Sequence, residues 1–89
     1  MTDSPAERAY KLTVGGREAG ALFYGRRGDR LVLHHTEIDP AFEGRGLGSK
    51  LVAGALEDVR ARGLEIVPLC PFVRRYLQRH PEDGDLVRA

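Results

Sequence analysis

Residues 37–51 read Glu-Ile-Asp-Pro-Ala-Phe-Glu-Gly-Arg-Gly-Leu-Gly-Ser-Lys-Leu, the pattern of a strand end, a short loop and a helix start. Three glycines at alternate positions, Gly44, Gly46 and Gly48, leave the loop nearly free of side chains, so a ligand can approach its backbone closely. The amide groups of the loop point out of the positive end of the predicted helix. We therefore expect an anion site here, suited to a cofactor that carries a pyrophosphate.

Two common phosphate-binding patterns do not match this loop. The dinucleotide fingerprint G-x-G-x-x-G requires a glycine where the chain has Ser49. A P-loop requires Gly-Lys-Ser or Gly-Lys-Thr, whereas the order here is Gly48-Ser49-Lys50. What remains is the pattern x-x-Gly-x-Gly between a strand and a helix. The loop alone leaves open a second interpretation, a tight turn before a helix.

The composition excludes several classes of protein. Eighty-nine residues make one domain with a single core, and 14 basic against 13 acidic residues do not predict an electrostatic nucleic-acid partner. A lone cysteine cannot form an internal disulfide and favours a reducing compartment. One cysteine and three histidines lack the usual metal-ligand spacings, and no apolar run approaches membrane-spanning length. We expect a cytoplasmic monomer that binds no metal, nucleic acid or membrane.

The first half of the chain predicts three strands. Residues 1–8 are polar and predict a flexible N-terminus before a single domain over residues 9–89. Side chains alternate over residues 9–14, which predicts a first strand, and Gly15-Gly16 is a hairpin signal. We expect a second strand over residues 17–26. Residues 31–38 form the most strand-like segment, and together the three strands predict an antiparallel meander.

The second half predicts a helix, a strand and a second, short helix. Apolar residues recur at helical spacing over residues 46–62, and Gly63 is placed to cap that helix. A fourth strand over residues 64–70 makes a strand–helix–strand unit, which implies a parallel pair with the third strand. Pro71 fits the first turn of the second helix. We expect residues 80–87 to form a loop with one apolar anchor.

Several segments appear in order along the chain with the glycine loop. They are His35-Thr36-Glu37-Ile38, Cys70-Pro71-Phe72-Val73, Tyr76-Leu77 and His80-Pro81. Together they resemble the GNAT superfamily of N-acetyltransferases, in particular its minimal single-domain branch, over about residues 9–87. The acetyl-CoA signature of that superfamily, Gln/Arg-x-x-Gly-x-Gly/Ala, is matched by residues 43–48, with Glu43 in the Gln/Arg position.

The resemblance implies a GNAT-like α+β fold whose third and fourth strands splay apart. The pantetheine arm of acetyl-CoA would lie in that split, and its pyrophosphate would lie on residues 44–49. Arg74, Arg75 and Arg79 form a basic cluster that could reach the adenosine 3′-phosphate. The residues expected to contact the cofactor are Ile38, Glu43, Gly44, Arg45, Gly46, Leu47, Gly48, Ser49, Pro71 and Phe72.

Four side chains are candidates for the chemistry. The resemblance places Cys70 and His35 near the thioester, where a Cys–His pair can make a nucleophilic thiolate. Cys70 could take the acetyl group first, or His35 could deprotonate the amine for direct attack. Tyr76 matches a tyrosine that protonates the leaving thiolate in larger relatives. Glu37 lies two residues from His35, where it could assist as a base or attract a cationic amine.

These residues predict an acetyl-CoA-dependent N-acetyltransferase that acts on a small amine or an exposed protein lysine. The backbone amide near Ile38 would polarise the thioester carbonyl, a role that needs no particular side chain. A second hypothesis is an acetyl-CoA-binding module or sensor that does not turn over. Glu43 in the signature and the absence of the N-terminal helices that shape the acceptor pocket in larger relatives favour that alternative.

Overall fold

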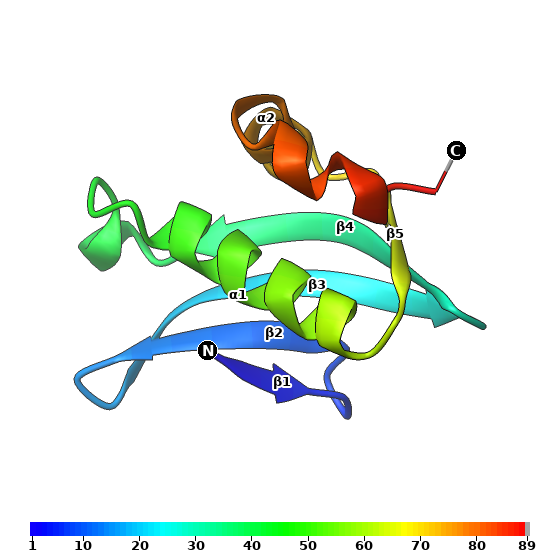
Figure 1. The fold of residues 1–89 in the computed structure, drawn as a ribbon. Helices are drawn as coiled ribbons and strands as arrows, with labels where there is room; N and C mark the ends of the chain where they lie inside the picture. The colour runs from blue at the N-terminus through cyan, green and yellow to red at the C-terminus, as the bar shows by residue number, and fades with distance from the viewer. Residues whose placement is uncertain (89) are drawn as a thin grey trace.

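Five strands form one mixed sheet in the computed structural model, which describes residues 1–88 (Figure 1). In chain order they are β1 (Thr2–Ser4), β2 (Ala9–Val14), β3 (Arg17–Arg27), β4 (Arg30–Ile38) and β5 (Glu65–Pro68), and this is also their order across the sheet. The strands β1 to β4 pair antiparallel, whereas β5 pairs parallel with β4. The predicted α+β fold, a meander with a parallel last strand, is confirmed.

Helix α1 (Leu47–Ala61) connects β4 to β5 and crosses one face of the sheet (Figure 1). Its buried stripe contains Leu51, Val52, Ala55, Leu56 and Val59, and packs into one core with side chains of β2, β3 and β4. The helix ends at a Schellman motif. There the chain turns through a left-handed glycine at φ 67°, and the N–H of Leu64 donates to the C=O of Val59 at 3.0 Å.

Helix α2 (Pro71–Arg79) follows β5 and packs against the same core through Val73. Proline at its first position is favourable because that N–H has no partner inside a helix. Two short 3₁₀ helices complete the chain, η1 (Pro40–Phe42) after β4 and η2 (Pro81–Leu86) after α2. The core therefore lies on one side of the sheet, and the opposite side, the outer face, carries no helix.

The parallel pairing of β4 and β5 covers only the first part of β4. Residues 30–33 pair with residues 65–68, and the N–H groups of Leu69 and Cys70 then both donate to the C=O of Leu33, at 3.0 and 2.9 Å. Beyond Leu33, β4 continues to Ile38 while the chain of β5 turns away into α2. The two strands thus diverge in a fork, as predicted from the resemblance.

A β-bulge in β4 sits at the mouth of this fork. Tyr24 pairs with Leu33 and Phe23 pairs with His35, so His34 is an extra residue on β4. Before the bulge, Leu33 faces the core; after it, Thr36 is paired with the core residue Leu22 and faces the core as well. His35 and Glu37 consequently face outward.

Two segments differ from the sequence expectation. The segment 1–8, expected to be loose, contains β1, whose residues pair with residues 9–11 of β2. The polar composition of this segment gives no strand signal. The strand forms at the edge of the sheet, where the side chain of Asp3 accepts hydrogen bonds from Tyr24 and Arg62. The segment 80–87, expected to be a loop, forms η2 and ends with a parallel bridge between Val87 and Ile66.

Candidate active site

A pocket of about 450 Å³ lies where the glycine loop meets the start of α1 and the ring of Phe72. All of the residues predicted to contact the cofactor line it, except Arg45 and Pro71. Phe42 and Arg79 also line this pocket. The guanidinium of Arg45 lies instead 5.4 Å from the centre of the Phe42 ring. Phe42 was not predicted as a site residue, because a lone aromatic side chain gives no functional signal in sequence.

The glycines of the loop explain why this pocket suits a phosphate. Gly44 and Gly46 have φ values of 79° and 69°, which side chains rarely allow, and a Cβ added at either would meet only open space. Gly46 is the N-cap of α1 and offers no side chain to the first amides of the helix. Those amides are left to bind an anion, so the site fits a pyrophosphate.

A smaller pocket of about 220 Å³ continues this one along α2. The two share Ser49, Phe72 and Arg79, and we call them together the cofactor groove. Arg75 and Arg79 supply positive charge to the smaller pocket, whereas Arg74 lines neither of the two.

Tyr76 lines the smaller pocket and stacks on His80 with ring centres 4.0 Å apart. Burial, together with the negative charges of Asp83 and Glu82, raises the pKa of the Tyr76 hydroxyl above its ordinary value. The hydroxyl therefore stays protonated at neutral pH and can donate a proton or a hydrogen bond.

Cys70 lies at the fork, directly before α2. Its side chain is 2% exposed, and its Sγ lies 3.3 Å from the Oγ1 of Thr36. Burial raises the pKa of the Cys70 thiol, but the Thr36 hydroxyl and the backbone amides of Val73, Phe72 and Thr36 outweigh it, so the pKa lies below its ordinary value. The fork thus holds a thiol that ionises more readily than its burial alone would allow.

Backbone amides of β4 also point into the fork. The N–H of Asp39 donates to the C=O of Ala19 on β3 at 2.8 Å. Because amides alternate between the two edges of a strand, the N–H groups of Ile38 and Thr36 face the edge that β5 has left. They are donors suited to a carbonyl oxygen or to an extended ligand paired along β4.

His35 and Glu37 lie on the outer face of the sheet. The Nε2 of His35 lies 3.1 Å from the Oε1 of Glu37, and the imidazole stacks on Phe23 with ring centres 6.2 Å apart. Within residues 1–88, no hydrogen bond joins His35 to Cys70, which contacts Thr36 on the core side instead. The structure therefore brings the predicted His35–Glu37 pair together, but it does not assemble the predicted Cys–His pair.

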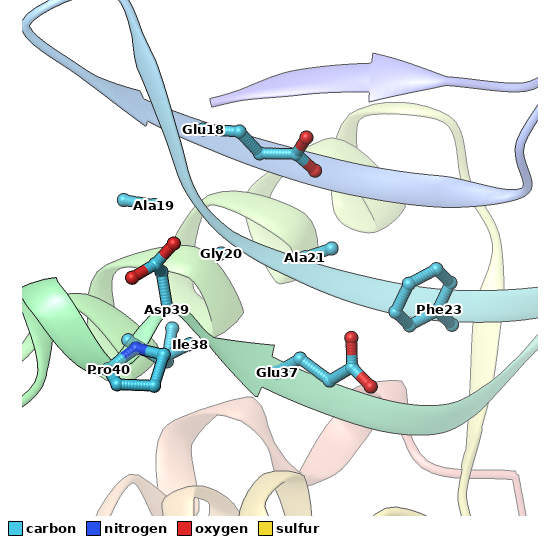
Figure 2. Close-up of a pocket in the computed structure, with 9 residues that line it drawn as sticks. All are labelled: Glu18, Ala19, Gly20, Ala21, Phe23, Glu37, Ile38, Asp39 and Pro40. Atoms are coloured by element: carbon cyan, nitrogen blue, oxygen red, sulfur yellow. The ribbon is translucent and has the colours of Figure 1, made fainter.

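A pocket of about 470 Å³ opens on the outer face at the ends of β3 and β4. Figure 2 shows the carboxylates of Glu18, Glu37 and Asp39 and the ring of Phe23 around it. We call it the acidic pocket. Ile38 lines both this pocket and the cofactor groove, so the two meet at the end of β4. Of its three carboxylates, only Glu37 was predicted, since nothing in the sequence places Glu18 beside β4.

Residues 1–88 contain neither a membrane-spanning helix nor a cluster of metal-ligating side chains. Within this range no helix is both long and apolar enough to cross a membrane. The same residues contain no group of three or more histidine, cysteine, aspartate or glutamate side chains arranged to hold a metal ion.

Sequence comparison identifies relatives along nearly the whole chain. A family model described as GCN5-related N-acetyl-transferase matches residues 9–86. Protein NATD1 of Mus musculus is 32% identical over 76 residues, which cover 83% of this chain and 69% of the relative. Protein NATD1 of Homo sapiens is also 32% identical over 76 residues, with 83% and 67% covered.

Two solved structures share the fold. The ribosomal-protein-S18-alanine N-acetyltransferase from Escherichia coli superposes with a TM-score of 0.62 and 25% identity over 70% of this chain. The matched region spans 42% of that enzyme, less than half of its length. A GCN5-like protein from Staphylococcus aureus, solved by NMR, superposes with a TM-score of 0.72 and 20% identity. There the match covers 93% of this chain and 83% of the other.

Proposed function

This chain belongs to the family of GCN5-related N-acetyltransferases, and from that premise we propose that it moves an acetyl group from acetyl-CoA to an amine. One observation carries the proposal. The pocket built from the glycine loop meets the acidic pocket at Ile38, on the far side of β4. The acetyl donor and the amine acceptor can therefore approach the same point from opposite faces of the sheet.

We propose that acetyl-CoA lies in the cofactor groove. The first amides of α1 and the glycine loop would bind the pyrophosphate, because Gly46 leaves them without a side-chain cap. Arg75 and Arg79 would bind further phosphate oxygens. The pantetheine arm would enter the fork and pair with the amides of β4, and the N–H of Ile38 would polarise the thioester carbonyl.

The acceptor amine would enter through the acidic pocket, where the carboxylates of Glu37 and Asp39 favour a cation. The third carboxylate, that of Glu18, is paired with Lys11 at 3.3 Å. Glu37, supported by His35, would take the proton that an ammonium must lose before its nitrogen can attack. The nitrogen then bonds to the carbonyl carbon and gives up its second proton to water. The carbon–sulfur bond breaks, and the thiolate takes a proton from Tyr76, whose raised pKa keeps it protonated.

A covalent route through Cys70 is the second candidate, and the lowered pKa of its thiol supports it. In this route the Cys70 thiolate would attack the thioester carbonyl and release the CoA thiolate; the amine would then attack the acetyl-Cys70 thioester and release the Cys70 thiolate. The division of side chains favours direct transfer, because Cys70 is buried on the core side while His35 and Glu37 line the outer side.

Intact mass of the protein after incubation with acetyl-CoA separates the two routes. Direct transfer predicts no acetyl adduct on Cys70, and a Cys70→Ala variant that still acetylates amines. An adduct that is lost in Cys70→Ala, together with lost turnover, would establish the covalent route instead. Binding of acetyl-CoA with no acetylation of polyamines, lysine peptides or N-terminal amines would favour the non-catalytic module.

A further inference from the structure

The outer face carries a second pocket, of about 670 Å³, that the proposed reaction does not use. Four arginines line it, Arg8, Arg26, Arg27 and Arg30, together with His34. Its apolar part is formed by Val32, Val67 and Leu69, and Leu69 is 53% exposed, an unusual state for a leucine at a strand end. We call this pocket the basic groove.

Ion pairs within residues 1–88 do not neutralise the charge of the basic groove. Within residues 1–88, none of its four arginines has a carboxylate within 4.0 Å, whereas Arg60, Arg62 and Arg88 all do. No acidic side chain lines the groove. Uncompensated guanidinium groups around a concave surface favour an anionic ligand, above all one that carries carboxylates or phosphates.

The arrangement of these arginines carries a cost in stability. Arg27 and Arg30 are directly paired across the hairpin of β3 and β4, and like charges in that position are destabilising. Arg8 has a φ of 53°, and its C=O is fixed by the N–H of Tyr24 at 2.9 Å. Folding therefore does not explain why these charges converge, which leaves a ligand as the simplest reason.

The basic groove lies beside the acidic pocket on the same face of the sheet. Phe23 lines the acidic pocket, and the next residues on β3, Tyr24 and Gly25, line the basic groove. On β4, Glu37 and His34 are three residues apart, which is roughly 10 Å along a strand. An extended polypeptide covers that distance with about three residues.

We propose that the basic groove docks an acidic segment of a polypeptide acceptor whose amine enters the acidic pocket. The proposal rests on the proposed acetyl transfer. A small amine would occupy only one of the two pockets, whereas a peptide with a lysine and nearby acidic residues matches both charges and their spacing. A nucleic acid is disfavoured, because Glu18, Glu37 and Asp39 on the same face repel a continuous polyanion.

Fluorescence anisotropy with labelled synthetic peptides tests this docking. The probe has one lysine and a run of glutamates that begins about three residues away; its matched control has glutamines in place of the glutamates. We expect the glutamate peptide to bind more tightly, and less so as salt is raised. Equal binding of the two peptides, or tighter binding of a labelled RNA oligonucleotide, would overturn the proposal.

Arg27→Glu is the informative variant, because it places a carboxylate opposite Arg30 and so should not destabilise the hairpin. We expect this substitution to lower the affinity for the glutamate peptide by at least about tenfold. The matched control is Arg74→Glu, an exposed arginine of α2 outside the basic groove, which should leave the affinity unchanged. Equal effects of the two variants would contradict a specific site.

Thermal stabilisation of the protein by acetyl-CoA is measured on the same samples. Failure of the docking proposal can then be told apart from failure of the acetyl-transfer proposal. Stabilisation without selective peptide binding would overturn the docking site alone. Selective peptide binding without stabilisation would overturn the acetyl-transfer proposal and leave a docking site for acidic peptides, though not for an acceptor.

Discussion

At the scale of single residues, the extra residue in β4 divides the site between the two faces of the sheet. His34 is unmatched in the register with β3, so His35 and Glu37 lie on the outer face while Thr36 faces Cys70. Of the two outer residues, Glu37 lines the acidic pocket. We propose that neighbouring residues therefore serve different tasks. The outer pair would handle the proton of the acceptor, and the fork would hold the thioester.

Glu37→Gln removes the proposed base but keeps the shape of the side chain. We expect kcat/KM for an acceptor amine to fall by about 10²- to 10⁴-fold, the usual contribution of a positioned base. Steady-state kinetics measure this, with stabilisation by acetyl-CoA as the control for cofactor binding. Full activity in Glu37→Gln would remove the carboxylate from the mechanism.

Gly48→Ala tests the close approach of α1 and α2 at the cofactor groove. A Cβ at this position would lie 2.5 Å from the ring of Phe72, so the ring must move. We expect a destabilisation of about 1–3 kcal/mol from overpacking, reduced by the better helix propensity of alanine. Chemical denaturation measures the change in the free energy of unfolding.

Gly54→Ala is the matched control in the same helix. Its Cβ would meet only the side chain of Met1, at 3.3 Å, and a terminal side chain can move. This variant should be neutral or more stable by up to about 1 kcal/mol. Equal destabilisation by both substitutions would contradict the special role of Gly48.

Residue types allowed the cofactor side of the site to be predicted, but not the catalytic pairing. Gly44 and Gly46 are visible in sequence because their positive φ values favour glycine, whereas at Gly48 a Cβ would meet the ring of Phe72. The bulge at His34 has no such signal, since its two neighbouring residues are ordinary strand residues. The resemblance implied that Cys70 and His35 lie together near the thioester. In the structure, the register of β4 beyond the bulge places His35 on the outer face and Thr36 beside Cys70.

At the scale of elements, β1 is held by its pairing with β2 and by the side chain of Asp3. Asp3 accepts a hydrogen bond from the hydroxyl of Tyr24 at 2.5 Å and another from Arg62 at 2.8 Å. These contacts join the edge strand to β3 and to the end of α1. The longer elements, by contrast, follow from periodicity: α1 begins and ends within one residue of the predicted 46–62. The short edge strand β1 has no alternation of apolar and polar residues from which it could be predicted.

The hydrogen bond from Tyr24 to Asp3 makes the stability of the protein depend on pH. Burial and the neighbouring Asp3 raise the pKa of the Tyr24 hydroxyl from 10.0 to about 12. The folded state therefore holds the proton more tightly, so this contribution is complete below pH 10 and is lost as the pH rises towards 12. Tm should fall over that window in the wild type and less steeply in Tyr24→Phe. Parallel curves measured by circular dichroism would contradict the coupling.

At the scale of the whole molecule, the fold separates a packed side from an open side. Both helices cover one face of the sheet (Figure 1). The outer face presents the acidic pocket beside the basic groove. Each of the two outer pockets is lined by residues that are far apart in the sequence. Arg8 and Arg30 both line the basic groove, and Glu18 and Glu37 both line the acidic pocket, so neither pocket can be recognised from the sequence alone.

Thermal unfolding with acetyl-CoA, with NADH and ATP as controls, tests the central claim that this cofactor occupies the groove at the glycine loop. A ligand at a hundredfold excess over its Kd stabilises by about 2.7 kcal/mol. In a domain of this size the midpoint should rise by more than about 10 °C. We expect that rise with acetyl-CoA alone, and a smaller one in Arg79→Glu, whose side chain lines the groove. No rise with acetyl-CoA, or an equal rise with ATP, would contradict the claim and leave the glycine loop as a tight turn before a helix.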